Sequence, residues 1–191
     1  MKVEDSTLAV ARAFERMGVR YYVCGSLASS LHGEPRATND ADLVAVLRVA
    51  DCDRLQRELG QRFLVDPDEF KAAVESERWF NLIDEVELAK VDVFCVRDAG
   101  YQAAALSRVM TLDLERGDPF SHASVASPED TVVAKLRWYR LGGEVSDRQW
   151  RDLQGVLAAQ AGRLDLEYIR KWCGHFHLLD LLERLLGSAN R

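Results

Sequence analysis

The sequence predicts an α+β fold in which a small sheet is followed by a helical C-terminal region. Two observations predict it. Short runs of apolar and β-branched residues alternate with helical segments in the first half of the chain. Beyond about residue 98 the pattern becomes helical, with clear capping signals.

The composition is that of a globular chain with a sizeable core. Of 191 residues, 48% are hydrophobic and 29% are charged, which excludes a disordered protein. The net charge of −6 means that any nucleic acid would need a local basic surface. The four cysteines are widely spaced, which argues against disulfides and Cys-based zinc sites. With no leader pattern and no apolar run near the ~18 residues of a membrane span, we expect a cytoplasmic protein without a membrane partner.

Each element has its own local signal. Apolar spacing predicts a helix over 5–17 that Gly18 ends, and Ser127-Pro128 is a strong start for a helix that ends before Gly142-Gly143. The other expected helices are 27–32, 52–59, 68–77, 146–159, 165–172 and 178–186. The expected strands are 19–24, 42–47, 63–65, 79–83 and 86–96.

A phosphate-binding signal lies at Gly25-Ser26, where a predicted strand ends and a helix follows. Backbone N–H groups, the serine hydroxyl and the helix dipole can all hold a phosphate there. Gly25 also lets the backbone approach a ligand closely. A plain turn is the alternative interpretation.

Two aspartates stand at the start of a buried strand. Asp40 and Asp42 are two residues apart, so on a strand their carboxylates point to one face, about 6.6 Å apart. They repel each other unless cations lie between them, and Mg²⁺ suits carboxylates that share it with substrate phosphates. Two solvated acids are the alternative.

A third acid, Asp92, lies inside the apolar strand Val91–Val96. Burying its charge needs compensation. Metal coordination beside Asp40 and Asp42 would provide it, and an ion pair with Lys90 or Arg97 is the alternative.

Together these residues resemble the signature of the polymerase-β-type nucleotidyltransferase superfamily: Gly25-Ser26, a gap of thirteen residues, Asp40-x-Asp42, and a later strand aspartate. The stretch from Arg36 to Leu43 is similar to the small AbiEii-like, toxin–antitoxin-associated branch. The later Lys135 and Asp152 also resemble that branch, so the resemblance covers roughly residues 20–155. Gly25-Ser26 departs from the Gly-Gly of many members of the branch.

The resemblance implies a small mixed β-sheet nucleotidyltransferase core flanked by helices at 1–126, and a helical region at 127–191 that completes the nucleotide pocket. It also implies roles for individual residues. Asp40, Asp42 and Asp92 would hold two Mg²⁺ ions, and Asp92 would accept the proton of the attacking hydroxyl.

The remaining implied roles concern the nucleotide. Gly25 and Ser26 would hold the triphosphate, and Lys135 would supply a positive charge to it. Asp152 would orient Lys135 or Arg148. Arg36 and Thr38 flank the acids and would support them. For Lys135 and Asp152, an ordinary surface position is the alternative.

The predicted activity is transfer of an NMP from an NTP to a hydroxyl, with tRNA or a protein favoured as acceptor and an antitoxin as a possible partner. A small-molecule (antibiotic-type) nucleotidyltransferase and a non-catalytic nucleotide- or partner-binding module are the alternatives. The basic residues Arg137, Arg140, Arg148 and Arg151 form a candidate rim for a phosphate-rich acceptor. His175 and His177 are expected to be structural, and Trp138 with Tyr139 fits an amphipathic helix better than a base-stacking platform.

Overall fold

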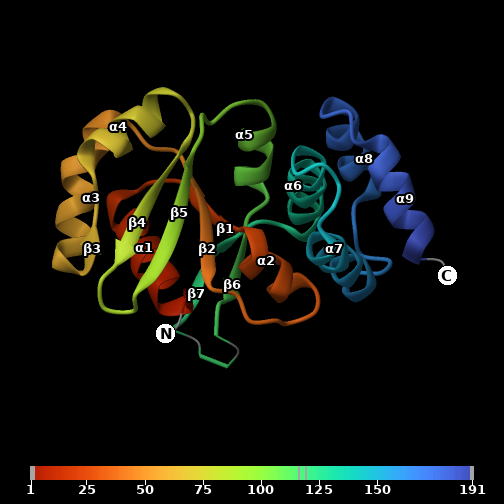
Figure 1. Cartoon of the computed structure of the whole chain (residues 1–191), viewed down its shortest axis with the longest axis horizontal. Helices are drawn as coiled ribbons and strands as arrows, with labels where there is room; N and C mark the ends of the chain where they lie inside the picture. Colours follow the sequence, from red (N-terminus) through yellow and green to blue (C-terminus); the bar gives the residue numbers. More distant parts are fainter. Residues whose placement is uncertain (1–2, 116, 119, 190–191) are drawn as a thin grey trace.

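The structure, a computed structural model, describes residues 3–115, 117, 118 and 120–189. Within these ranges the strands form one seven-stranded mixed sheet in the order β3-β4-β5-β2-β1-β7-β6, so the α+β prediction is confirmed (Figure 1). The strands are β1 Tyr21–Cys24, β2 Asp40–Ala45, β3 Phe63–Leu64, β4 Trp79–Asp84, β5 Ala89–Cys95, β6 Met110–Asp113 and β7 His122–Val125.

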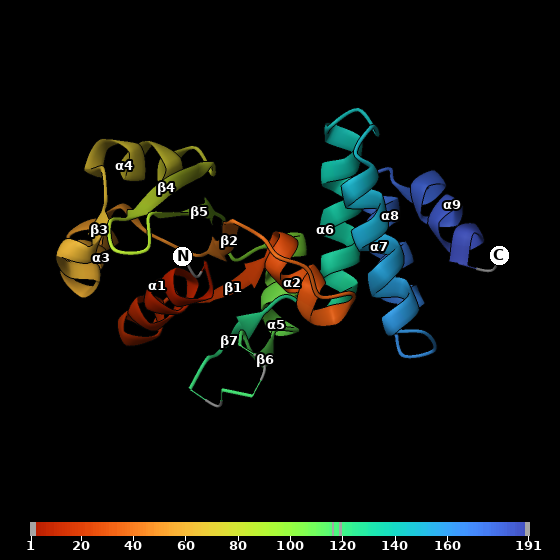
Figure 2. The same cartoon turned by 60° about the horizontal axis from the view of Figure 1, so that its bottom comes forward.

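The described ranges also contain α-helices. They are α1 Val3–Met17, α2 Gly25–His32, α3 Cys52–Leu59, α4 Pro67–Glu75, α5 Gly100–Ser107, α6 Pro128–Leu141, α7 Asp147–Ala159, α8 Leu166–His175 and α9 Leu179–Ala189. Figure 2 shows α6 to α9 stacked side by side, beyond α2 and α5, at the end of the molecule away from β3 and β4. No helix in the described ranges is both long and apolar enough for a membrane span.

Alternation along the central strands gives the protein two cores. Leu43 of β2 and Val91 and Val93 of β5 are fully buried on the face that packs against α1, α3 and α4. Tyr22 and Val44, on the opposite face, join a second core built from α5 to α9. Because strand residues alternate between faces, Asp40, Asp42 and Asp92 share this second face.

The expected helix starts at Ser127 and Ser146 are confirmed. The Ser127 hydroxyl accepts a hydrogen bond from the backbone N–H of Asp130, and Pro128 occupies the first turn of α6. The Ser146 hydroxyl caps α7 in the same way. These caps fix where α6 and α7 begin. They therefore also fix the positions of Lys135 and Asp152 along those helices.

The expectation that the chain is helical beyond residue 98 is wrong for β6 and β7. These two strands pair antiparallel with each other, and β7 runs parallel to β1 through Val23 and Val125. Their sequences, Met-Thr-Leu-Asp and His-Ala-Ser-Val, have weak strand propensity, so pairing with β1 decides their conformation. The strand predicted from residue 86 begins at Ala89, because residues 85–88 form the turn after β4. The division at 126/127 stays a prediction.

Candidate active site

Strand register brings the predicted acids together. In the parallel pair of β2 and β5, Asp42 lies directly opposite Asp92. The neighbouring strands extend this row, because Cys24 of β1 is opposite Asp42 and Asn81 of β4 is opposite Asp92. We call Asn81, Asp92, Asp42 and Cys24 the polar row. Asp40 lies two residues before Asp42 on the same face, opposite Lys90.

The electrostatic state of Asp42 reflects this crowding. Burial, and after it the nearby carboxylates of Asp92 and Asp40, raise the pKa of Asp42 to about 6, against the opposing effect of Lys135. A carboxylate with like charges at close range is the arrangement that a bound cation relieves.

Among the residues that the structure describes, only one of the two carboxylate oxygens of Asp92 has a hydrogen-bond partner. Its Oδ2 accepts a hydrogen bond from Nζ of Lys90 at 2.9 Å, so the expected alternative of a Lys90 ion pair is present. Arg97 pairs with Glu77 instead. Within the described residues, nothing donates a hydrogen bond to the buried Oδ1 of Asp92. An unpaired buried carboxylate oxygen is costly, so a ligand that reached this atom would relieve that cost.

Gly25 is required by its contact with the polar row. Its φ of +62° lies in the left-handed region, and a Cβ there would lie 1.9 Å from Oδ2 of Asp42. The backbone at the start of α2 therefore lies directly against this carboxylate. Ser26 follows, and its hydroxyl accepts a hydrogen bond from Arg36 at 2.7 Å. The expected start of this helix was Leu27, but α2 begins at Gly25.

Arg36, Lys135 and Asp152 form one partly buried network. Asp152 accepts two hydrogen bonds from Arg36, both at 2.8 Å, and one from Nζ of Lys135 at 2.8 Å. Burial raises the pKa of Asp152, but the two cationic partners outweigh it and the pKa is lowered. Burial lowers the pKa of Lys135, and the bond to Asp152 opposes that shift. Asp152 thus contacts Lys135, and its second partner is Arg36 rather than Arg148. That Asp152 orients Lys135 toward a nucleotide stays a prediction.

A hollow of about 530 Å³ lies between α7 and the segment before β2. Its lining includes Arg36, Thr38, Asp40 and Asp152, together with Arg148 and Arg151. The Thr38 hydroxyl contacts the backbone of Asp40 at 3.3 and 3.4 Å. These predicted residues therefore share one concave surface that opens beside Asp40.

The predicted basic rim is divided by the fold. Arg148 and Arg151 line the hollow beside Asp40. Arg140 pairs with Asp180 and Glu144, and Arg137 lies over the ring of Phe176 at 4.8 Å. Two of the four arginines therefore face the candidate site, and two hold the helical region together.

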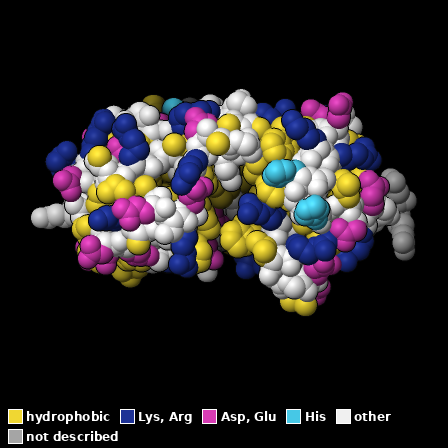
Figure 3. All heavy atoms as spheres, turned by 90° about the horizontal axis from the view of Figure 1, so that it is seen from above, with side chains coloured by type: hydrophobic (Ala, Val, Ile, Leu, Met, Phe, Trp, Pro, Cys, Tyr) yellow, Lys and Arg dark blue, Asp and Glu magenta, His cyan; other side chains and the backbone are white. Residues whose placement is uncertain are grey.

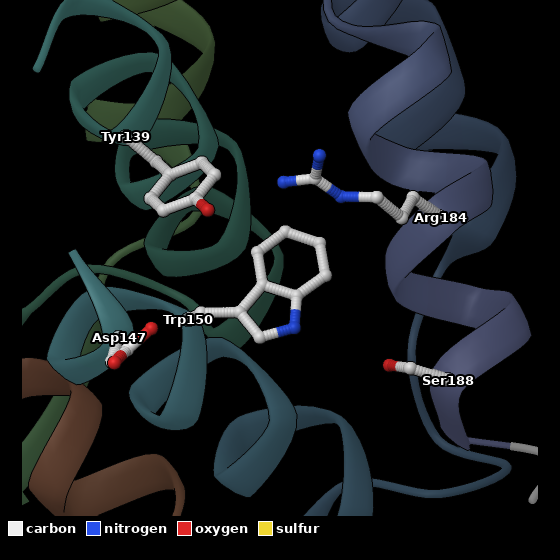
Figure 4. Close-up of a pocket in the computed structure, with 5 residues that line it drawn as sticks. All are labelled: Tyr139, Asp147, Trp150, Arg184 and Ser188. Atoms are coloured by element: carbon white, nitrogen blue, oxygen red, sulfur yellow. The ribbon is translucent and has the colours of Figure 1, made fainter. Parts of the chain in front are cut away.

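A second hollow, of about 410 Å³, lies between α6, α7 and α9 (Figure 4). Figure 4 shows Arg184 directed toward the rings of Tyr139 and Trp150, and its guanidinium lies 4.4 Å from the centre of the Trp150 ring and 5.5 Å from that of Tyr139. Asp147 and Ser188 complete its lining. The stacked arginine joins α9 to α6 and α7, and none of these residues belongs to the predicted site.

The donor set of the polar row fits a hard divalent cation. Carboxylate oxygens are the ligands that Mg²⁺ prefers, the pKa of Asp42 is raised by burial and neighbouring acids, and Asp92 keeps an unpaired oxygen. In the side-chain positions of the described ranges, no three His, Cys, Asp or Glu side chains form a ready metal-binding group. The Lys90 ammonium, rather than a third carboxylate, contacts Asp92 here.

Sequence reasoning missed Asn81 as a member of this site. Asn81 faces Asp92 across β4 and β5, and within the described residues its buried Oδ1 also accepts no hydrogen bond. Its signal, a polar residue in an apolar strand, is visible in the sequence, but its partner becomes visible only once the strand order is known.

Comparison with known proteins gives structural relatives only. No protein-family model matches the chain, and no curated protein matches it significantly. Among solved structures, the chain is similar to the antibiotic-resistance factor ANT(2'')-Ia in solution, with 13% identity, a TM-score of 0.53, and coverage of 98% of this chain and 100% of that one. The chain is also similar to ANT(2'')-Ia in complex with adenylyl-2"-tobramycin, with 12% identity, a TM-score of 0.51, and coverage of 93% of this chain and 98% of that one.

A second solved relative is the antigenic nucleotidyltransferase-like protein from Paracoccidioides brasiliensis, with 15% identity, a TM-score of 0.51, and coverage of 95% of this chain and 91% of that one. At these identities the likeness shows the fold alone: the chain has a nucleotidyltransferase-like fold. The AbiEii-like branch is not shown by these relatives.

Proposed function

We propose that the protein is a Mg²⁺-dependent nucleotidyltransferase that moves an NMP from an NTP to a hydroxyl and releases pyrophosphate. The observation that carries this proposal is the register of Asp42 opposite Asp92, with the backbone of Gly25 against Asp42. Two carboxylates at the edge of a phosphate-binding turn are the arrangement that an NTP with Mg²⁺ requires. The fold of the solved relatives supports the same class of reaction.

The residues of the chain have distinct roles in this proposal. Asp40, Asp42 and Asp92 hold Mg²⁺, which when bound stabilises charge on the entering and leaving oxygens. Asp92 accepts the proton of the attacking hydroxyl through the oxygen that now has no donor. Lys90, whose Nζ lies 2.9 Å from Oδ2 of Asp92, would have to leave if that oxygen were also to hold the metal.

The triphosphate is held by groups on the other side of Asp42. The N–H groups at the start of α2 and the Ser26 hydroxyl receive it, and Lys135 supplies a positive charge to it. Asp152 keeps Lys135 and Arg36 in place through its three hydrogen bonds. Thr38 supports Asp40 from the preceding segment.

We further propose tRNA or a protein as the acceptor, as in the toxin–antitoxin-associated enzymes that the motifs resemble, with an antitoxin as a possible partner. Arg148 and Arg151 in the hollow beside Asp40 support a phosphate-rich acceptor. A small molecule is the second candidate, because a solved relative is described as a complex with adenylyl-2"-tobramycin.

The test is incubation of the purified protein with each α-³²P-labelled NTP, Mg²⁺ and a cell extract. We expect label in RNA or protein, and label in a small molecule would select the second candidate. Asp42→Asn should lower transfer by about 10³-fold, whereas Asp53→Asn, a change of an exposed acid on α3, should leave it intact. Absence of label in every fraction, with all four NTPs, would contradict the proposal and favour a non-catalytic binding module.

A further inference from the structure

Three aromatic rings lie beside the polar row. Trp79 of β4 is opposite Phe94 of β5, and their ring centres are 6.3 Å apart. Trp138 of α6 continues the series, with its ring centre 5.9 Å from that of Phe94. We call Trp79, Phe94 and Trp138 the aromatic shelf. The three rings come from different elements, so the fold assembles them rather than one amphipathic helix.

The shelf is exposed, which an ordinary core cluster is not. Trp79 is 46% exposed and Trp138 is 49% exposed, while Phe94 between them is partly buried. Single exposed aromatic side chains are common, but two exposed tryptophans bridged by a third ring form a continuous apolar surface, which typically marks a binding site. Figure 3 shows hydrophobic side chains gathered where the sheet-bearing and helical parts of the molecule meet.

The register places the shelf at a defined distance from the acids. Trp79 and Phe94 pair directly, as do Asn81 and Asp92, so the two rows are parallel and two residues apart on the same face. That separation is about 6.6 Å along a strand. A nucleotide whose phosphate lies at the polar row can therefore reach the shelf with its base, because only the ribose separates the two groups.

Helix α6 connects the shelf to the phosphate side of the site. Lys135 and Trp138 are three residues apart, so they are neighbours on the helix surface. A cation and an exposed ring on adjacent positions suit one ligand that carries both phosphate and a flat ring. If the shelf bound a ring of the acceptor instead, that ring would not need to lie next to Lys135.

We propose that the aromatic shelf binds the nucleobase of the NTP by stacking, with Trp138 and Trp79 as its principal contacts. This inference rests on the proposed function of the polar row. Stacking on aromatic rings accepts every base, because each has a flat π-face. We therefore expect purine nucleotides to bind more tightly than pyrimidine nucleotides, without selection of a single base.

The test measures binding rather than turnover. Titration calorimetry with Mg²⁺ compares a nucleotide whose α–β bridging oxygen is replaced by carbon with inorganic tripolyphosphate, which has no base. Trp138→Ala and Trp79→Ala should each weaken nucleotide binding at least fivefold, the lower end of what one lost stacking contact costs. Binding of tripolyphosphate should be unchanged, which also shows that the variants are folded.

Two further variants complete the design. Trp138→Phe keeps a ring and should retain most of the affinity for the nucleotide. Phe120→Ala is the matched control, because the Phe120 side chain is 82% exposed. The Phe120 carbonyl accepts a hydrogen bond from Arg12 of α1. It should bind both ligands as the wild type does.

The outcomes separate the two proposals. If both tryptophan variants bind the nucleotide as tightly as the wild type, the shelf does not hold the base and this inference is wrong, even if the rings later prove to contact the acceptor. If the wild type binds neither the nucleotide nor tripolyphosphate, the proposed function itself is wrong.

Discussion

The same hairpin, β4 and β5, carries one fully buried acid, Asp84, and one partly buried acid, Asp92, and their charges are compensated to different extents. Asp84, at the end of β4, is fully buried and accepts hydrogen bonds from Ser6, from Arg62 and from the backbone N–H groups of Val86 and Glu87. Burial raises the pKa of Asp84, but these bonds outweigh it and lower the pKa to about 2. Asp92, in the middle of β5, has Lys90 and an oxygen without a donor among the described residues.

The difference separates an acid that stabilises the fold from acids that, in the proposed function, bind a ligand. Asp84 is saturated by its neighbours, so nothing remains for it to bind. Asp42, opposite Asp92, has its pKa raised to about 6 by burial and by the other acids. Perturbed and incompletely paired acids gather at functional sites. The predictions below test this contrast.

The largest effect is expected on turnover at the polar row. Asp42→Asn and Asp92→Asn should each lower the rate of NMP transfer by about 10³-fold, because each removes a metal ligand and the second also removes the proton acceptor. The measurement is single-turnover transfer of labelled NMP, normalised to folded protein. Both variants should keep the circular dichroism spectrum of the wild type.

A rate within tenfold of wild type in both variants would contradict the metal-dependent mechanism. A loss that follows only from a smaller folded fraction of Asp92→Asn would instead assign that residue to the ion pair with Lys90.

The next largest effect is on stability at the saturated acid. Asp84→Asn should lower the free energy of unfolding by about 2–3 kcal/mol, because it removes the charge that pairs with Arg62 and accepts the hydrogen bond of Ser6. Urea unfolding measures it. Asp53→Asn, at an exposed position, should change this free energy by less than about 0.5 kcal/mol. If Asp84→Asn is equally mild, the claimed saturation is wrong.

The pH dependence of Asp84 has a definite sign. Its pKa in the folded protein, about 2, lies below the ordinary value of 3.8, so its ionised form favours folding. This contribution, about 2 kcal/mol, is complete above pH 4 and is lost as the pH falls toward 2. Unfolding measured between pH 2 and pH 5 should show a smaller acid dependence in Asp84→Asn than in the wild type.

At the polar row, replacing an acid is expected to raise the stability of the protein rather than to lower it. Without metal, Asp42→Asn should raise the melting temperature by a few degrees, because it removes a buried charge that Asp92 and Asp40 repel. Differential scanning calorimetry with EDTA measures this change. Added Mg²⁺ should raise the melting temperature of the wild type but not that of Asp42→Asn. A lower melting temperature for the variant in EDTA would show that Asp42 is stabilised rather than strained.

The sequence alone was sufficient to predict those features whose signals lie within a few neighbouring residues. The caps at Ser127 and Ser146, the strands around Asp42 and Asp92, and the Gly25 turn each have a signal within a few residues. The strand order is not local, so the Asp92–Asn81 pair, β6 and β7, and the aromatic shelf could not be derived. Trp138 in particular looks like part of an amphipathic helix until Phe94 and Trp79 are placed beside it.

The smallest expected effect concerns the arginines around the site. Arg151 lines the hollow beside Asp40, whereas Arg140 is held by Asp180 and Glu144 away from it. If the acceptor is RNA, transfer should weaken with salt, and Arg151→Ala should reduce the log–log slope by about 0.7–0.9, the share of one phosphate contact. Arg140→Ala should leave the slope unchanged, because its charge is already paired. NTP affinity should stay nearly constant in both variants. Transfer that is indifferent to salt between about 50 and 200 mM would exclude RNA and leave a protein or a small molecule as the acceptor.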